Sequence, residues 1–207
     1  DDVPPPPDIQ PYPKDGLAVS GNVVVERPEL LAPESPEAVR LAAAIASQVT
    51  DEENRSTIRW KSIWVHPVSP SDRAATPLTL EVISSSPGID PRSRVFAFEG
   101  VKRYPGFWRT ARPGGAPEEC EFLTYASGWA LASSDGTVTK AVVNTELSNC
   151  NREGLAYVLP LGIVRAGGRL FWVIQRSTWD AERYDVVEIR ASEVREPAAS
   201  MLGGACQ

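Results

Sequence analysis

The chain has one histidine, His66, in the segment Trp64-Val65-His66-Pro67. Nucleophilic triads, and zinc sites built on several imidazoles, need partners that this sequence does not supply at a recognisable spacing. A lone histidine where a strand runs into a proline-containing loop is more often structural or on the surface than catalytic. The Gly-x-Ser-x-Gly and Ser-x-x-Lys motifs are absent as well. The sequence therefore predicts no catalytic residue of the nucleophilic type.

Phosphate-binding and redox motifs are also missing from the sequence. Gly114-Gly115 is followed by Ala-Pro, and Gly167-Gly168 falls at a predicted hairpin turn, so neither pair belongs to a Rossmann or Walker loop. No Cys-x-x-Cys pair occurs, which argues against a thioredoxin-like site or covalently attached haem. We expect no cofactor and no metal ion.

Two groups of acidic residues could carry hydrolytic chemistry. One precedes a predicted strand, and the other surrounds a turn beside Trp179. Two carboxylates next to an aromatic ring suit an enzyme that cleaves a glycosidic bond. Acids are common in turns, however, so the simpler interpretation is that both groups are solvated. The groups are Glu118, Glu119 and Glu121, and Asp180, Glu182 and Asp185.

The segment 91–113 reverses the charge of an otherwise acidic chain, because it holds six basic residues and one acid, Glu99. Cations interleaved with aromatic rings are typical of surfaces that bind an anionic polymer, a lipid headgroup or an acidic protein. The alternative is that these cations pair with acids of their own chain. The candidate residues for binding a partner or anion are Arg92, Arg94, Lys102, Arg103, Trp108, Arg109 and Arg112.

Cys120 and Cys150 stand 15 residues either side of Asp135, which with Gly136 forms a strong tight-turn dipeptide. A hairpin turning there brings the two cysteines together at its open end. We predict a Cys120–Cys150 disulfide. Cys206 is then a free or partner-bonded thiol beside Gly203-Gly204.

The expected location is extracytoplasmic: periplasm, cell surface or secreted. A disulfide persists in an oxidising compartment, and the chain begins at Asp1 rather than methionine, which we interpret as removal of a signal peptide. The net charge of −6 disfavours general affinity for nucleic acid. No apolar run reaches the roughly 18 residues that a membrane-spanning helix needs.

Residues 1–16 form a separate region with six prolines and few apolar side chains. Such a composition predicts an extended arm of polyproline character. We expect this arm to lie on a neighbouring subunit rather than to complete the chain's own core.

Residues 17–207 are expected to form a single domain. Ser35 and Pro36 provide an N-cap and a first helical residue, and apolar residues at helical spacing follow, which predicts a surface helix over about 36–50. About eight strands follow, which favours a mainly β, antiparallel sandwich or barrel-like domain. The end, 192–207, is expected to hold a short helix interrupted by Pro197. The expected strands are 58–66, 78–84, 94–98, 123–132, 137–146, 155–164, 169–177 and 184–190.

These features favour a non-enzymatic accessory subunit or binding module of an envelope or extracellular protein assembly. The first alternative is a carboxylate-based extracytoplasmic hydrolase acting on carbohydrate. The second is an anion-binding module that uses the basic segment 91–113.

Overall fold

A computed structural model describes residues 20–60, 62–110, 118–152, 154–178 and 180–205. Within this part there are two helices, α1 (Pro36–Glu53) and α2 (Pro70–Ala75), and twelve strands. The strands are β1 (Val24–Glu26), β2 (Glu29–Leu31), β3 (Ile58–Trp60), β4 (Ile63–Val65), β5 (Thr79–Pro87), β6 (Arg94–Thr110), β7 (Glu118–Ala132), β8 (Val138–Asn149), β9 (Tyr157–Ala166), β10 (Arg169–Ser177), β11 (Ala181–Ile189) and β12 (Val194–Ala205).

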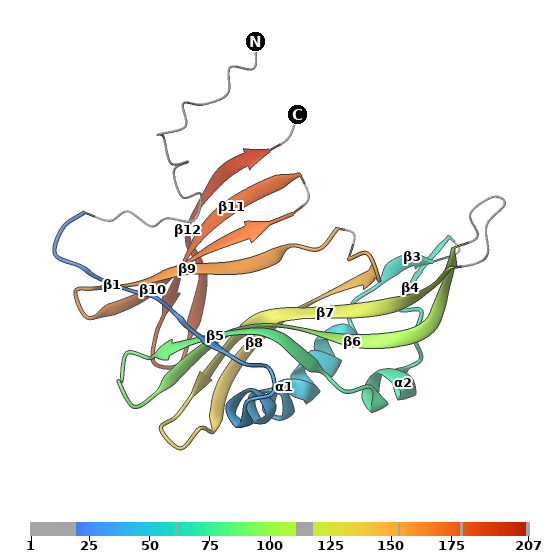
Figure 1. The fold of residues 1–207 in the computed structure, drawn as a ribbon, viewed down its shortest axis with the longest axis horizontal. Helices are drawn as coiled ribbons and strands as arrows, with labels where there is room; N and C mark the ends of the chain where they lie inside the picture. The colour runs from blue at the N-terminus through green and yellow to red at the C-terminus, as the bar shows by residue number, and fades with distance from the viewer. Residues whose placement is uncertain (1–19, 61, 111–117, 153, 179, 206–207) are drawn as a thin grey trace, which may run out of the picture.

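Ten of these strands form two antiparallel sheets, in the orders β1-β9-β10-β11-β12 and β2-β5-β6-β7-β8, and β3 and β4 form a separate hairpin. The predicted mainly β, antiparallel architecture with an N-terminal helix is therefore confirmed. The barrel alternative is wrong, because neither sheet closes on itself. Figure 1 shows the outer ends of β10, β11 and β12 pointing away from the β5–β8 sheet.

Helix α1 begins as the sequence predicts and ends three residues later than expected, at Glu53. The side chain of Ser35 accepts a hydrogen bond from the amide of Ala38, and Pro36 is the first helical residue. The helix lies across one face of the β5–β8 sheet (Figure 1). Its apolar stripe faces that sheet and consists of Ala38, Leu41, Ile45 and Val49.

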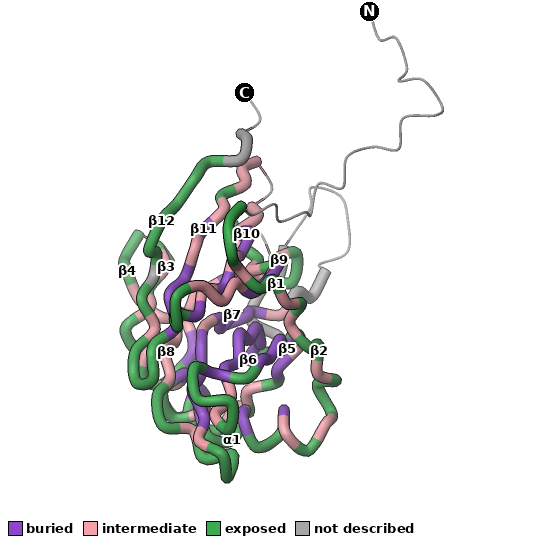
Figure 2. The backbone as a smooth tube through the Cα atoms, turned by 90° about the vertical axis from the view of Figure 1, so that its left-hand side faces the viewer, coloured by how far each residue is buried: buried purple, intermediate pink, exposed green. Residues whose placement is uncertain are grey.

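The opposite face of the β5–β8 sheet packs on the second sheet. Trp129 of β7 and Trp172 of β10 meet edge to face, with ring centroids 5.3 Å apart. Both indoles are almost fully buried, and such pairs contribute about 1 kcal/mol beyond the burial of apolar area. The β6–β7 region is correspondingly the most deeply buried part of the tube in Figure 2.

Two predicted turns are confirmed. β7 and β8 form a hairpin that turns at Asp135-Gly136, where Gly136 has a φ of 83°. β9 and β10 turn at Gly167-Gly168. Pro160 lies beside a shift in the β9–β10 register, at a bulge, as expected for a proline inside a strand.

The residues that follow the N-terminal arm cover one edge of each sheet. β1 pairs with β9, and β2 pairs with β5. The outer strands on the other side are β8 and β12. The edge of β8 is partly covered at Thr145, whose hydroxyl is 2.7 Å from that of Ser56.

Two expectations about local structure are wrong. The strand expected at 58–66 is the β3–β4 hairpin, with Ser62 in the left-handed region at φ 73°. The short helix expected at 192–207 is the strand β12. The helix α2 follows β4, and Ser69 is its N-cap. No helix among the described residues is long and apolar enough to cross a membrane.

Candidate functional site

The first two candidates of the basic segment lie at its N-terminal end and contact acids. Arg92 is exposed and 3.5 Å from Asp90. Arg94 opens β6 and contacts Glu29 at 2.7 Å and Glu37 at 3.7 Å. Arg94 thus ties β6 to β2 and to the start of α1.

Lys102 is buried beneath the C-terminal end of α1. Its ammonium donates to Glu53 Oε2 at 2.8 Å, to Thr50 Oγ1 at 2.9 Å and to the carbonyl of Arg73 at 2.6 Å. All three donors of the ammonium are therefore used inside the protein. Lys102 links β6 to both helices and is closed to an external partner.

Glu53 is the centre of this buried network. Its second oxygen accepts hydrogen bonds from Tyr104 Oη and Thr124 Oγ1, each at 2.5 Å. Burial disfavours the charge, but the hydrogen bonds outweigh burial and lower the pKa of Glu53 to about 2. Burial and the carboxylate together raise the pKa of Tyr104.

His66 packs at the same network. Its Nδ1 accepts a hydrogen bond from the amide of Val68 at 3.1 Å, so the other nitrogen carries the proton in the neutral ring. That nitrogen, Nε2, is 3.6 Å from Glu53 Oε1. The imidazole lies edge-on to Tyr104 and Phe122, and its side chain is only 4% exposed. His66 therefore helps to dock the segment after β4 onto the sheet.

Arg103 points to the other face of β6, where it shares Glu81 with Arg152. Arg103 is 2.8 Å from Glu81 and 3.2 Å from Glu121, and Arg152 is 2.7 Å from Glu81. Burial opposes the charge of Glu81, but contacts with Arg152 and Arg103 outweigh it and lower the pKa of this carboxyl. The positive charges of the two arginines are thus balanced by the negative charges of Glu81 and Glu121.

The remaining three candidates lie at the C-terminal end of the segment. The backbones of Trp108 and Arg109 belong to β6 and face Cys120 and Glu119 across the ladder. Their side chains, and all of Arg112, lie outside the described residues. The structure does not bring the seven candidates together, since Lys102 points to the helix-covered face and Arg103 to the opposite one.

The two predicted acid groups are held by local partners where the structure describes them. Glu121 pairs with Arg103, whereas the side chains of Glu118 and Glu119 are outside the described residues. Asp180 accepts a hydrogen bond from Thr178 Oγ1 at 2.9 Å.

Among the predicted acids whose side chains the structure describes, Asp185 is the most buried. It is 2.9 Å from Arg176 and 3.0 Å from Arg183, and it accepts a hydrogen bond from Ser200. Burial opposes its charge, but these contacts outweigh burial and lower its pKa. Asp185 therefore joins β10, β11 and β12.

Two further carboxyls, which sequence reasoning missed, flank a buried tyrosine on the inner face of the β5–β8 sheet. Glu146 lies opposite Tyr125 in the β7–β8 register, and Glu99 lies two residues along β6 from Val101, the residue that pairs with Tyr125. Burial raises the pKa of both carboxyls. Burial and then the charge of Glu99 raise the pKa of Tyr125. Glu99 also accepts a hydrogen bond from the amide of Val158, which ties β6 to β9.

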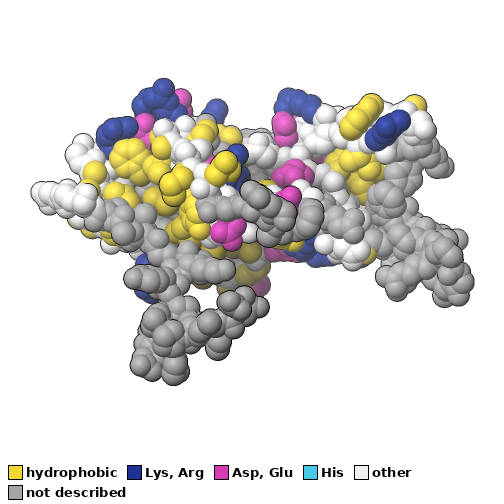
Figure 3. All heavy atoms as spheres, turned by 90° about the horizontal axis from the view of Figure 1, so that it is seen from above, with side chains coloured by type: hydrophobic (Ala, Val, Ile, Leu, Met, Phe, Trp, Pro, Cys, Tyr) yellow, Lys and Arg dark blue, Asp and Glu magenta, His cyan; other side chains and the backbone are white. Residues whose placement is uncertain are grey.

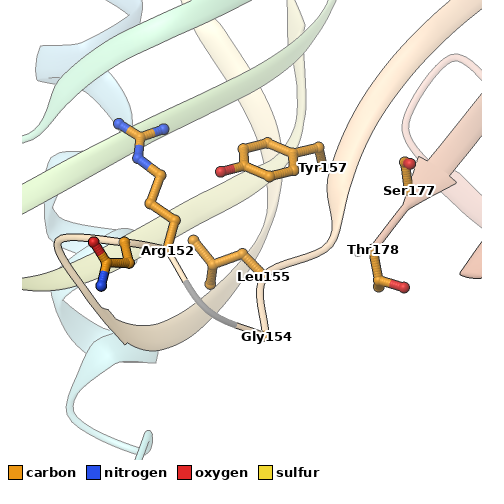
Figure 4. Close-up of a pocket in the computed structure, with 7 residues that line it drawn as sticks. Arg152, Gly154, Leu155, Tyr157, Ser177 and Thr178 are labelled. Atoms are coloured by element: carbon orange, nitrogen blue, oxygen red, sulfur yellow. The ribbon is translucent and has the colours of Figure 1, made fainter. Parts of the chain in front are cut away.

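A cavity of about 570 Å³ lies near Tyr125, because Tyr157 in the cavity wall packs against the ring of Tyr125. Figure 4 shows the residues that line this cavity. Its walls come from the β8–β9 connection and from the end of β10. Tyr157 stands opposite Ser177 in the β9–β10 register. The described lining residues are Asn151, Arg152, Gly154, Leu155, Tyr157, Ser177 and Thr178.

The strand β12 is an outer strand that pairs with β11 in the described part of the chain. Residues 197–205 of this strand carry no charge. Met201 is 66% exposed and Leu202 is 80% exposed. Figure 2 shows β12 as exposed along most of its length. Sequence reasoning missed this edge, because it predicts a short helix in 192–207 where the structure has β12.

Other parts of the surface mix charges of both signs. In Figure 3, basic and acidic side chains lie next to each other with hydrophobic side chains between them. An extended surface of one sign is not visible on that face.

The predicted disulfide stays a prediction. Cys150 follows β8 directly, and the β7–β8 register pairs Phe122 with Asn149. Cys120 lies two residues before Phe122 in β7, at the same end of the hairpin as Cys150. The side chain of Cys120 and all of Cys206 are outside the described residues.

No family model matches the chain, and neither curated proteins nor solved structures show a significant similarity to it. Function is therefore inferred from the arrangement of the residues.

Proposed function

We propose that the protein is a non-enzymatic binding module, or accessory subunit, of an extracytoplasmic protein assembly. It binds an extended, uncharged segment of a partner protein by strand addition at β12. The observation that carries this proposal is the uncharged run 197–205 on an outer strand with exposed Met201 and Leu202.

An outer strand presents a row of backbone N–H and C=O groups that can pair with another strand. Proteins usually protect such edges with charged residues, prolines or very short strands. β12 has twelve residues. Its charged side chains, Arg195 and Glu196, precede the run 197–205, and its one proline, Pro197, is the first residue of that run, so 198–205 contains neither a charge nor a proline. Charge complementarity favours an uncharged partner, because an ionic side chain paired with this run would find no counter-charge on it.

The edge is also held in position before binding. Ser200, in the middle of the uncharged run, donates to Asp185, which Arg176 and Arg183 fix in turn. A partner strand therefore meets a backbone that is already ordered, which lowers the entropic cost of association.

The N-terminal arm supplies a second contact in this proposal. Residues 1–16 lie outside the described part of the chain. The chain that follows them enters β1, at the edge of the sheet opposite β12. The arm and β12 can thus engage different surfaces of one assembly.

A carboxylate hydrolase is the second candidate, favoured by Glu99 and Glu146 on either side of Tyr125. A raised carboxyl pKa suits a general acid. β6 and β8 are two strand spacings apart, roughly 10 Å, and Glu99 is offset from Glu146 by two residues along the strands. Loss of polysaccharide hydrolysis in both Glu99→Gln and Glu146→Gln would favour this candidate.

The proposal is tested by capture of the native assembly on immobilised protein. The Met201→Lys/Leu202→Lys variant places two charges on the edge, and Ile63→Lys/Trp64→Lys places two on the exposed strand β4 as a matched control. We expect capture of the same partner to fall about tenfold or more with the β12 variant and to stay unchanged with the control. Equal capture by both variants, with unchanged melting temperatures, would overturn the proposal.

A further inference from the structure

The cavity beside the β8–β9 connection is lined by groups that recognise polar molecules. At about 570 Å³ it is within the range of small-molecule sites, about 300–1,000 Å³. Asn151 contributes an amide, and Ser177 and Tyr157 contribute hydroxyls. In Figure 4, the hydroxyl end of Tyr157 points towards Arg152, and Ser177 and Thr178 line the other side.

The cavity also offers an aromatic face that is fixed in place. Tyr157 is 39% exposed, and its ring packs edge-on against Tyr125, with centroids 6.0 Å apart. Tyr125 is buried and forms a small apolar cluster with Leu155 and Val101. Because Tyr125 packs against the ring of Tyr157, this side chain already has little conformational freedom. It therefore loses little conformational entropy when a ligand covers its exposed part.

The charges at the cavity wall are balanced. The guanidinium of Arg152 is held by Glu81, which Arg103 also contacts, and Arg103 pairs in turn with Glu121. The hydrogen bond to Glu81 raises the pKa of Arg152, so the guanidinium stays charged and paired. An anion would have to compete with Glu81 for it, whereas a neutral ligand would not.

We propose that this cavity binds one unit of a neutral glycan. A sugar ring has an apolar C–H face that fits the ring of Tyr157, and a rim of hydroxyl groups that fits the amide of Asn151, the hydroxyl of Ser177 and the paired Arg152. This inference does not depend on strand addition at β12, because the two features share no residue.

Isothermal titration of the full chain with maltotriose, cellotriose and chitotriose, and with inorganic phosphate as the anionic probe, tests the proposal. We expect at least one of the neutral trisaccharides to bind and phosphate to fail. Amide resonances of residues 151–157 and 177–178 should shift on binding. Binding should be unaffected in the Met201→Lys/Leu202→Lys variant.

Three variants locate the site. Tyr157→Ala should weaken trisaccharide binding about tenfold or more. The exposed Asn151→Ala, which removes one amide without touching the core, should weaken it several-fold. Trp64→Ala is the control. It removes an aromatic side chain that is 69% exposed and does not line the cavity, so trisaccharide binding should stay unchanged. The proposal is overturned if none of the three trisaccharides binds, if phosphate binds instead, or if Asn151→Ala and Tyr157→Ala both bind as the wild type does.

Discussion

Lys102 and Glu53 form an ion pair, 2.8 Å from Nζ to Oε2, in which both side chains are 2% exposed or less. The pair joins β6 to the last residue of α1, and every ammonium proton has an acceptor. It explains why the one lysine of the basic segment is unavailable to a partner.

Replacing Lys102 by Met should destabilise the protein by about 3–5 kcal/mol, because the carboxylate of Glu53 would stay buried without its counter-charge. Arg92→Met is the control. Its contact with Asp90 is exposed, so its loss should leave the free energy of unfolding almost unchanged. Urea unfolding measures both, and equal effects would contradict this role for Lys102.

Glu53 should also make stability depend on acid pH. Its folded-state pKa is about 2, below the ordinary value of 4.5. The contribution to stability is therefore fully present above pH 4.5 and is lost as the pH falls from 4.5 towards 2. In Glu53→Gln, the free energy of unfolding should vary less over this interval than in the wild type. Parallel pH profiles of the two proteins would disprove the assignment.

Glu99 should have the opposite effect, since burial raises its folded-state pKa. Its ionisation costs stability as the pH rises from 4.5 through the raised pKa. In Glu99→Gln the amide oxygen can still accept the hydrogen bond from Val158. The melting temperature of the variant, relative to wild type, should therefore increase between pH 4 and pH 7. A relative decrease over that range would show that the negative charge of Glu99 is needed.

The Cys120–Cys150 disulfide is tested by intact-mass measurement of alkylated protein without reductant. The two residues are 30 positions apart, so the crosslink should contribute about 3–4 kcal/mol in the chain-entropy model. Cys150→Ser should lower the melting temperature to that of the reduced wild type. Alkylation of both Cys120 and Cys150 in the unreduced protein would exclude the crosslink.

Local sequence signals were sufficient for α1 and for the β7–β8 hairpin. Ser35-Pro36 and Asp135-Gly136 specify their backbone conformations over a few residues, so no distant contact is needed to predict them.

β12 was mispredicted because its local and tertiary preferences disagree. Residues such as Ala198, Ala199 and Leu202 favour helix, but pairing with β11 overrides that preference. Pro197 lies where the ladder passes from Arg195 to Ala199 through a register shift, so it blocks no strand pairing there.

The two carboxyls beside Tyr125 and the cavity could not be predicted for a different reason. Glu99 and Glu146 are far apart in sequence, and each is a single acid in an ordinary strand. Only the pairing of β6, β7 and β8 brings them to Tyr125. The cavity likewise forms between the β8–β9 connection and the end of β10. No sequence motif indicates that these two segments lie close together.

Hydrogen–deuterium exchange of the captured assembly tests strand addition most directly, because it reports on the backbone amides that a partner strand would pair with. If a partner strand pairs with β12, amide exchange across residues 197–205 should be slower in the assembly than in the free protein. The Met201→Lys/Leu202→Lys variant should show no such slowing. Unchanged exchange in β12, with protection appearing elsewhere on the protein, would contradict strand addition at β12.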